Sequence, residues 1–339
     1  MAIERQQSLS LPWKTKLQLS VADFVTDMTL RRDGTLNRRL VDFLDRKVPA
    51  KSTPRNGVRS HDVTVDAHGN VWFRVFVPTH VPSDVVSLPV IFFFHGGGFS
   101  LLSAATPAYD AVCRRFARKI NAVVVSLNYR LAPEHKFPAQ YDDGFDALKF
   151  IDENRQSLEF WPENADVGRC FLAGDSAGGN LAHHLGVRAS QAEFKEVKII
   201  GLIVIQPFFY GKDRTESEIR LEGAPIVSRR RVEWMWKAFL PKGEDLDHWA
   251  VNVSGPNAVD ISGLEVPPVI LFVGGFDPLR DWQLRYHDWL KNSGKDVTLF
   301  DVPTVCHAFY VFPEIPESLM LIREITDFIE KQSSKIRVR

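Results

Sequence analysis

The chain has 339 residues, of which 45% are hydrophobic, and its 24 Phe and 8 Trp can fill a sizeable core. This composition excludes an intrinsically disordered protein, and the length is compatible with one α/β domain. The 42 Lys and Arg balance the 42 Asp and Glu, so no excess positive charge is available for a phosphate backbone and we expect no nucleic-acid partner.

The cysteines and the lengths of the hydrophobic runs indicate the cellular compartment of the protein. Cys113, Cys170 and Cys306 are odd in number and lack the spacing of a metal site, so we expect a reducing environment without a disulfide framework. No apolar secretory segment and no run long enough to cross a bilayer is found. These features predict a cytoplasmic protein without a membrane span, which could also be present in the nucleus. They leave the oligomeric state open.

The first predicted element is an amphipathic helix from about Leu11 to Leu30. Its apolar residues recur at helical spacing; they are Trp13, Leu17, Val21, Phe24, Val25 and Met28. We expect this face to pack on the body of the protein, where the helix could also close over a pocket as a lid.

Short apolar or alternating runs then predict strands. They include residues 71–77, 90–94, 122–127, 170–173, 199–206, 269–273 and 296–301. Helix-like stretches lie between several of them, at 109–120, 144–154, 179–189 and 282–293. This alternation is typical of a mostly parallel sheet covered by helices on both faces, the α/β class.

One region interrupts the alternation. Residues 208–249 are charged and aromatic and stand between two predicted strands, with Trp234 and Met235 on a predicted helix. We interpret this region as an insertion above the sheet that forms a cap together with the N-terminal segment 1–48. Residues 1–339 are then a single domain.

A candidate nucleophile, Ser176, stands in the sequence Gly-Asp-Ser-Ala-Gly at 174–178. The motif directly follows a predicted strand and precedes a predicted helix. That context is typical of a nucleophile elbow, a sharp turn that holds a serine hydroxyl above the sheet. The small flanking residues suit it, because strand and helix approach closely there. The alternative is a glycine-rich turn with an incidental serine. Such a turn need not lie between a strand and a helix, so the observed context favours the nucleophile elbow.

A second motif, His-Gly-Gly-Gly at 95–98, follows the predicted strand 90–94. Glycines let backbone N–H groups turn toward a developing oxyanion, as in the corresponding loops of lipases and esterases. A phosphate-binding loop is the alternative, but neither of its glycine-rich patterns occurs in the chain. His95 precedes the glycines, so we expect it to orient the loop rather than to act as a base.

The acid and the base of a triad are expected after the serine, in that order along the chain. Asp277 follows the predicted strand 269–273, at a strand end where such folds collect functional groups. Asp281 is its nearest competitor, although it also fits a helix N-cap. His307 follows the predicted strand 296–301 and lies after both Ser176 and Asp277. We therefore predict His307 as the general base.

Taken together, the motifs resemble the plant carboxylesterases, which belong to the hormone-sensitive-lipase group of α/β-hydrolases. The resemblance extends over nearly the whole chain and is carried by residues 95–99, 129–135, 174–180, 277–281 and 307–309. It implies an α/β-hydrolase fold with Ser176, Asp277 and His307 as the triad. It also implies that the N–H groups of Gly97, Gly98 and Ala177 form the oxyanion hole.

Four further segments resemble the gibberellin receptors, at 31–38, 43–48, 214–218 and 236–241. That branch consists of former hydrolases whose N-terminal segment closes over the hormone, and an aliphatic residue replaces their catalytic histidine. This chain keeps His307, and it has Met235 where the receptors have a tyrosine that contacts the hormone. Both differences favour an enzyme over a receptor.

These residues predict the hydrolysis of a carboxylic ester through an acyl-enzyme, without a metal or an organic cofactor. We expect the partner to be a small, largely apolar ester, because the predicted pocket is mostly apolar. Its walls are Phe99, Phe208, Phe209, Trp234, Met235, Tyr310 and the N-terminal helix. The alternatives are a gibberellin-receptor-like binding protein, or a lyase or dehydratase that uses the same base and oxyanion hole.

Overall fold

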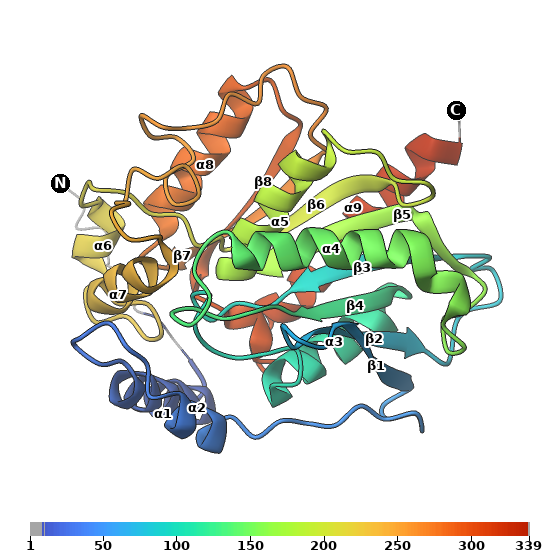
Figure 1. Cartoon of the computed structure of the whole chain (residues 1–339), viewed down its shortest axis with the longest axis horizontal. Coiled ribbons are helices and arrows are strands. Elements are labelled where there is room, and N and C mark those ends of the chain that lie inside the picture. Colours follow the sequence, from blue (N-terminus) through green and yellow to red (C-terminus); the bar gives the residue numbers. More distant parts are fainter. Residues whose placement is uncertain (1–8, 10, 338–339) are drawn as a thin grey trace, which may run out of the picture.

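The computed structural model describes residues 9 and 11–337, which are built around one central sheet (Figure 1). Its strands are β1 (Val58–Asp66), β2 (Val71–Pro78), β3 (Leu88–Phe94), β4 (Val123–Asn128), β5 (Ala165–Asp175), β6 (Ile199–Ile205), β7 (Val269–Phe276) and β8 (Val297–Cys306). They lie in the order β1-β2-β4-β3-β5-β6-β7-β8. β2 pairs antiparallel with β1 and β4, and every other neighbouring pair is parallel.

Helices cover both faces of this sheet. On one face lie α4 (Ala139–Asn154), α5 (Ala177–Ala189) and α8 (Arg280–Asn292), and on the other lie α3 (Pro107–Ile120) and α9 (Glu317–Arg337). Phe92 and Phe94 of β3 belong to the first core, and Ile91 and Phe93 to the second. All four are fully buried. A strand buried on both faces needs no polar side, which explains the unbroken apolar run of β3. The prediction of a mostly parallel sheet between helical layers is confirmed.

Four elements of the structure are not predicted by the sequence patterns above: β1, α9 and two short helices, α2 (Arg38–Leu44) and α6 (Glu216–Arg220). β1 lies at the edge of the sheet, and polar residues such as His61, Asp62 and Thr64 interrupt its apolar positions. Because an edge strand is partly solvated, its apolar signature is weaker than that of the central strands.

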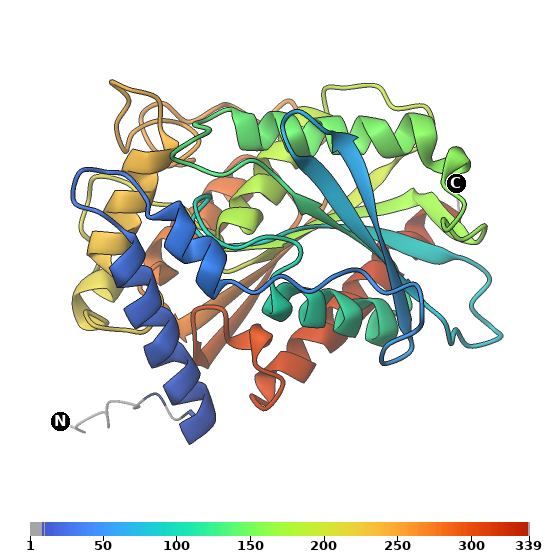
Figure 2. The same ribbon diagram turned by 60° about the horizontal axis from the view of Figure 1, so that its bottom comes forward.

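The N-terminal helices α1 (Trp13–Thr29) and α2 (Arg38–Leu44) pack beside α7 (Arg229–Phe239), which follows the short α6 (Glu216–Arg220) between β6 and β7 (Figures 1 and 2). Arg231 of α7 forms ion pairs with Asp23 and, at 2.8 Å, with Asp27 of α1. The indole of Trp234 donates to the carbonyl of Arg31 at 2.8 Å. The N-terminal segment is therefore joined to the 208–249 region by specific polar contacts.

The apolar face of α1 differs from the expectation. Five of its six apolar residues are more than half exposed: Trp13, Leu17, Val21, Phe24 and Met28. The buried residues of the helix are instead Thr15, Leu19 and Thr29. The predicted helix is present, but the prediction that this apolar face packs on the body is wrong. Ion pairs to Arg231 and a hydrogen bond from Thr15 to Glu314 orient the helix with its polar side inward.

Among the described helices, none is both long enough and apolar enough to cross a membrane.

Candidate active site

Ser176 occupies a strained turn between β5 and α5. Its φ of 53° and ψ of −119° lie in a region that non-glycine residues rarely adopt. The Ser176 N–H donates to the Ile205 carbonyl at 3.0 Å, and its own carbonyl accepts from the Phe208 N–H at 2.8 Å. A Cβ atom at Gly178 would lie 1.8 Å from the Phe94 carbonyl oxygen, so only glycine fits there. The structure thus has the strand-turn-helix geometry that the motif predicts.

Asp277 and His307 meet across the ends of β7 and β8. Asp277 is fully buried, His307 is 3% exposed, and His307 Nδ1 lies 2.7 Å from Asp277 Oδ2. Burial lowers the pKa of His307. The charge and hydrogen bond of Asp277, with the charge of Asp175, outweigh this effect and raise that pKa above its ordinary value. The carboxylate therefore holds the ring and favours its cation.

The glycine loop adopts a conformation that requires glycine. Gly97 and Gly98 have φ values of 102° and 58°, and a Cβ atom at Gly97 would lie 2.3 Å from the Leu101 carbonyl oxygen. His95 is buried, and its Nδ1 lies 2.8 Å from the Gly96 carbonyl oxygen. Burial lowers the pKa of His95 to about 4, so a neutral ring stands beside the loop, which fits an orienting role. Ala177, the third oxyanion candidate, directly follows Ser176 at the start of α5.

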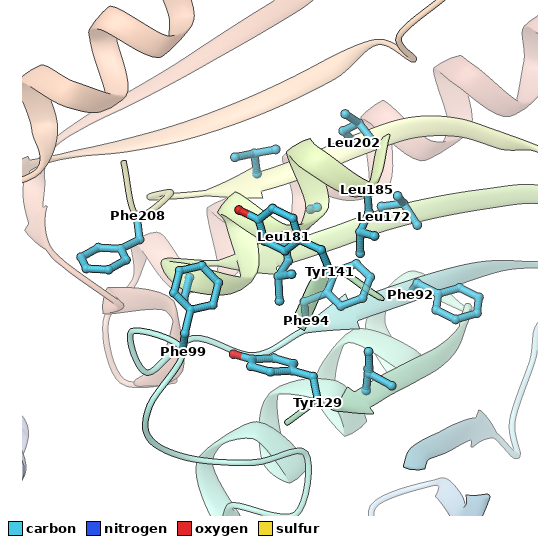
Figure 3. Close-up of a cluster of buried hydrophobic side chains, with 14 of the residues drawn as sticks. Phe92, Phe94, Phe99, Tyr129, Tyr141, Leu172, Leu181, Leu185, Leu202 and Phe208 are labelled. Carbon is cyan, nitrogen blue, oxygen red and sulfur yellow. The ribbon is translucent and has the colours of Figure 1, made fainter. Parts of the chain in front are cut away.

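Three predicted pocket residues lie around this loop. Met235 of α7 is in direct contact with it, since a Cβ atom at Gly98 would lie 2.0 Å from Met235 Sδ. Phe99 and Phe208 are buried, with ring centroids 6.3 Å apart (Figure 3). Phe208 stacks on Trp236 at 4.5 Å, so the cap region supplies part of the same aromatic cluster.

The other three predicted pocket residues lie elsewhere. Phe209 is buried against Tyr286 of α8, with ring centroids 4.6 Å apart. Tyr310 is buried on the opposite side of the sheet, in the core that contains α3 and α9. Trp234 contacts the N-terminal segment through its bond to the Arg31 carbonyl. An aromatic residue near a motif can point into the core as readily as into a pocket, and the sequence does not distinguish these directions.

Asp281, the competitor of Asp277, has a different task. Its Oδ2 accepts from the Ser217 N–H at 2.8 Å, and its own N–H donates to Ser217 Oγ at 3.3 Å. It therefore joins the first turn of α8 to α6, and it is not the N-cap of α8, which is Leu279.

Two glutamines complete the surroundings of Asp277 and were not singled out by any motif. Gln206 Nε2 donates to Asp277 Oδ2 at 3.2 Å, and Gln283 Nε2 donates to the same oxygen at 2.9 Å. The Leu279 N–H donates to Asp277 Oδ1 at 2.9 Å. Only the position of Gln206, directly after an apolar strand, could have marked it as a candidate.

Two further observations concern ligands. The described residues contain no group of three or more His, Cys, Asp or Glu side chains with the geometry of a metal site. A cavity of about 550 Å³ lies beside α5, lined among others by Tyr141, His184, Trp249 and Trp289. None of the candidate catalytic residues lines this cavity.

The sequence matches a known family and is similar to two groups of plant proteins. Residues 91–311 match the family model described as alpha/beta hydrolase fold. The gibberellin receptor GID1C of Arabidopsis thaliana is 40% identical over 333 residues, which cover 95% of each chain. Probable carboxylesterase 6 of the same plant is 39% identical over 284 residues, covering 83% of this chain and 81% of that one.

Solved structures agree with this family. An alpha/beta hydrolase enzyme from the metagenome of Lake Arreo has a TM-score of 0.74 at 27% identity and covers 97% of this chain and 100% of its own. A hyperthermophilic esterase from the archaeon Pyrobaculum calidifontis has a TM-score of 0.72 at 29% identity, with coverages of 95% and 99%. The elbow, the order of the parallel strands and these matches lead to one conclusion: the chain belongs to the α/β hydrolase fold family.

Proposed function

We propose that the protein is a carboxylesterase in which Ser176, His307 and Asp277 form the catalytic triad. The observation that carries this proposal is the buried pair of His307 and Asp277, joined at 2.7 Å. It lies at the carboxyl ends of β7 and β8, and Ser176 follows the carboxyl end of β5 in the same parallel sheet. Functional groups of open α/β sheets collect at this edge.

The reaction follows from these positions. His307 takes the proton of the Ser176 hydroxyl as that oxygen attacks the ester carbonyl, and Asp277 stabilises the imidazolium that forms. His307 then gives the proton to the leaving alcohol, which departs as the acyl-enzyme is formed. Water, deprotonated by His307, attacks the acyl-enzyme, and the acid and free Ser176 are released.

The oxyanion and the substrate are held by different parts of the site. The N–H groups of Gly97, Gly98 and Ala177 are the proposed donors to the developing oxyanion, and one such donor contributes about 3 kcal/mol to the transition state. Phe99, Phe208 and Met235 offer the ester only hydrocarbon and a thioether. This lining favours a small, largely apolar ester.

Turnover of p-nitrophenyl acetate and butyrate by the purified protein tests the proposal. We expect saturable hydrolysis that falls by about 10⁶-fold in Ser176→Ala. Ser190→Ala is the matched control, because its hydroxyl only donates to the Val187 carbonyl at the end of α5, and it should retain the wild-type rate. Turnover that survives Ser176→Ala would exclude the proposed nucleophile.

A second candidate function is the binding of a gibberellin-like small molecule. It is favoured by the similarity to the receptors, which includes the N-terminal segment, and by the contacts of that segment with α7. If this function holds, gibberellin should slow hydrogen exchange in α1, and the protein should turn over none of the short esters. Hydrolysis without any effect of gibberellin on α1 would favour the esterase.

A further inference from the structure

Gln206 occupies a special place at the end of β6. It is 1% exposed and adopts a φ of 44°, and its N–H donates to the Phe272 carbonyl of β7 at 2.9 Å. The residue before it, Ile205, accepts the N–H of Ser176 at 3.0 Å. The backbone of this short segment is thus bonded directly to the candidate nucleophile.

The side chain of Gln206 reaches in the other direction, to the loop that carries His307. Its Nε2 donates to the Cys306 carbonyl at 3.1 Å and to Asp277 Oδ2 at 3.2 Å, and its Oε1 accepts from the Ala308 N–H at 2.8 Å. One amide therefore bonds the backbone on both sides of His307 and also the carboxylate that holds the ring.

The local backbone provides room for this amide. A Cβ atom at Gly274 of β7 would lie 2.5 Å from Gln206 Nε2, so a side chain at that position would displace the amide. The amide orientation is also fixed by its partners, because the Nε2 side faces two acceptors and the Oε1 side faces a donor. Reversing it would set the amide oxygen against a carboxylate and a carbonyl, which leaves buried groups unsatisfied.

We propose that Gln206 is a positioning residue for catalysis, which holds the His307 loop and Asp277 in fixed relation to Ser176. This inference rests on the proposed hydrolase function. The positioning role requires a side chain that can donate to Cys306 and Asp277 and also accept from Ala308. A carboxylate at position 206 would lose the donor and place a second negative charge beside Asp277. A small displacement of a general base is costly, since an error of about 1 Å can reduce a rate about 100-fold.

Gln283 provides a matched comparison. It donates to the same oxygen, Asp277 Oδ2, and is fully buried, but no bond joins its side chain to the His307 loop. Gln206→Met and Gln283→Met each replace an amide by an unbranched apolar side chain of similar size, so both remove one donor to Asp277. Only the first also releases Cys306 and Ala308.

The experiment measures kcat, KM and the pH profile of p-nitrophenyl butyrate hydrolysis for Gln206→Met, Gln206→Glu and Gln283→Met. We expect Gln206→Met to lower kcat about 10- to 100-fold with KM changed less than about 2-fold. In Gln283→Met the decrease in log kcat should be less than about a third of the decrease in Gln206→Met. Gln206→Glu should also move the acid limb of the profile to higher pH, because its charge adds to those of Asp277 and Asp175 near His307. A wild-type kcat in Gln206→Met, or equal losses in the two Met variants, would overturn the proposal.

A readout that does not depend on turnover separates this inference from the proposed function. If the wild type and Ser176→Ala hydrolyse the ester equally, the triad is wrong, but the ring of His307 can still be observed by ¹⁵N NMR. We expect the Gln206→Met variant to shift and broaden the His307 resonances, whereas Gln283→Met leaves them narrow. His307 resonances that are unchanged in Gln206→Met contradict the positioning role, whatever the activity.

Discussion

The hydroxyl of Tyr109 joins the glycine loop to the nucleophile turn: it donates to Asp175 Oδ2 at 3.0 Å and accepts from the Gly96 N–H at 2.7 Å. Asp175 immediately precedes Ser176, and Gly96 immediately precedes Gly97. Burial raises the pKa of Tyr109 well above its ordinary value, so the phenol stays protonated and can donate. One side chain from α3 thus joins the backbone segments that carry the proposed nucleophile and the proposed oxyanion donors.

Removing this hydroxyl should impair catalysis more than binding. In Tyr109→Phe the Gly96 N–H and Asp175 Oδ2 lose a buried partner, which costs about 1–3 kcal/mol of folding free energy. We expect kcat to fall about 10-fold, because the proposed oxyanion loop loses an anchor and shifts from its position, while KM changes little. Tyr286→Phe is the control, since that buried hydroxyl pairs with His183 behind α5. Steady-state kinetics and urea unfolding of both variants check the prediction, and an equal fall in kcat in both would contradict it.

Gly98 should tolerate no side chain while Met235 is in place. A Cβ atom there would lie 2.0 Å from Met235 Sδ, at a φ of 58°. We expect Gly98→Ala to lower kcat about 10- to 100-fold by displacing an oxyanion donor. Gly223→Ala, with a φ of 87° and no atom within 4 Å of the added carbon, should show backbone strain in unfolding but normal kinetics. The loss in Gly98→Ala can come from the clash with Met235 or from backbone strain at the positive φ. If the clash is the larger cause, the double variant Gly98→Ala with Met235→Ala should recover part of kcat.

Activity should disappear on the acid side as His307 becomes protonated. Because its pKa is raised and the base must be neutral, kcat/KM is expected to rise with pH through that raised value. In Asp277→Asn only the charge of Asp175 still opposes the effect of burial, so the pKa of His307 should fall and the acid limb should move to lower pH. We expect kcat to drop about 10⁴-fold in the same variant. Asp281→Asn, which alters only the contact with Ser217, should keep both limb and rate. A profile of Asp277→Asn that coincides with the wild type speaks against the assignment.

Much of this arrangement could be predicted because strand ends are readable from the sequence. Ser176, Asp277 and His307 each follow an apolar run, in the order the triad requires, and the structure joins Asp277 to His307. The contacts of Gln206 and Tyr109 could not be predicted, since each is a single polar group whose partners come from distant segments. Periodicity predicted α1 correctly, but it could not predict that ion pairs would turn the apolar face of this helix to solvent.

Buried neutral histidine should make the fold sensitive to acid. Burial lowers the pKa of His183 to about 3, whereas in the unfolded chain a histidine titrates near 6.5. Between these values the unfolded state binds more protons at His183. The contribution of this residue to the free energy of unfolding is therefore complete above about pH 6.5 and is lost as the pH falls toward 3. We expect His183→Leu to reduce the slope of unfolding free energy against pH by up to about 1.4 kcal/mol per unit. His68, an exposed residue, provides the control His68→Asn, whose slope should equal that of the wild type.

The ion pairs of Arg231 should decide how firmly α1 is held. Its side chain is 7% exposed and bonds both Asp23 and Asp27, so Arg231→Met leaves two carboxylates without their partner. The guanidinium is buried although both carboxylates are partly exposed, so these pairs are more costly to break than a pair that is exposed on both sides. We expect hydrogen exchange in α1 to become at least about 10-fold faster and KM to rise, with kcat changed less.

Arg229→Met is the matched control for this last prediction, because Arg229 lies two residues away on α7 but pairs only with Glu233 on the surface. Exchange in α1 and KM should both stay at wild-type values in this variant. Hydrogen exchange followed by mass spectrometry measures α1 directly, and ester kinetics on the same samples measure its effect on the site. Equal exchange in both variants would mean that other contacts, such as the 2.6 Å bond from Thr15 to Glu314, hold the helix. Faster exchange with an unchanged KM would instead separate the position of α1 from substrate binding, and the N-terminal helix would then be no part of the pocket wall.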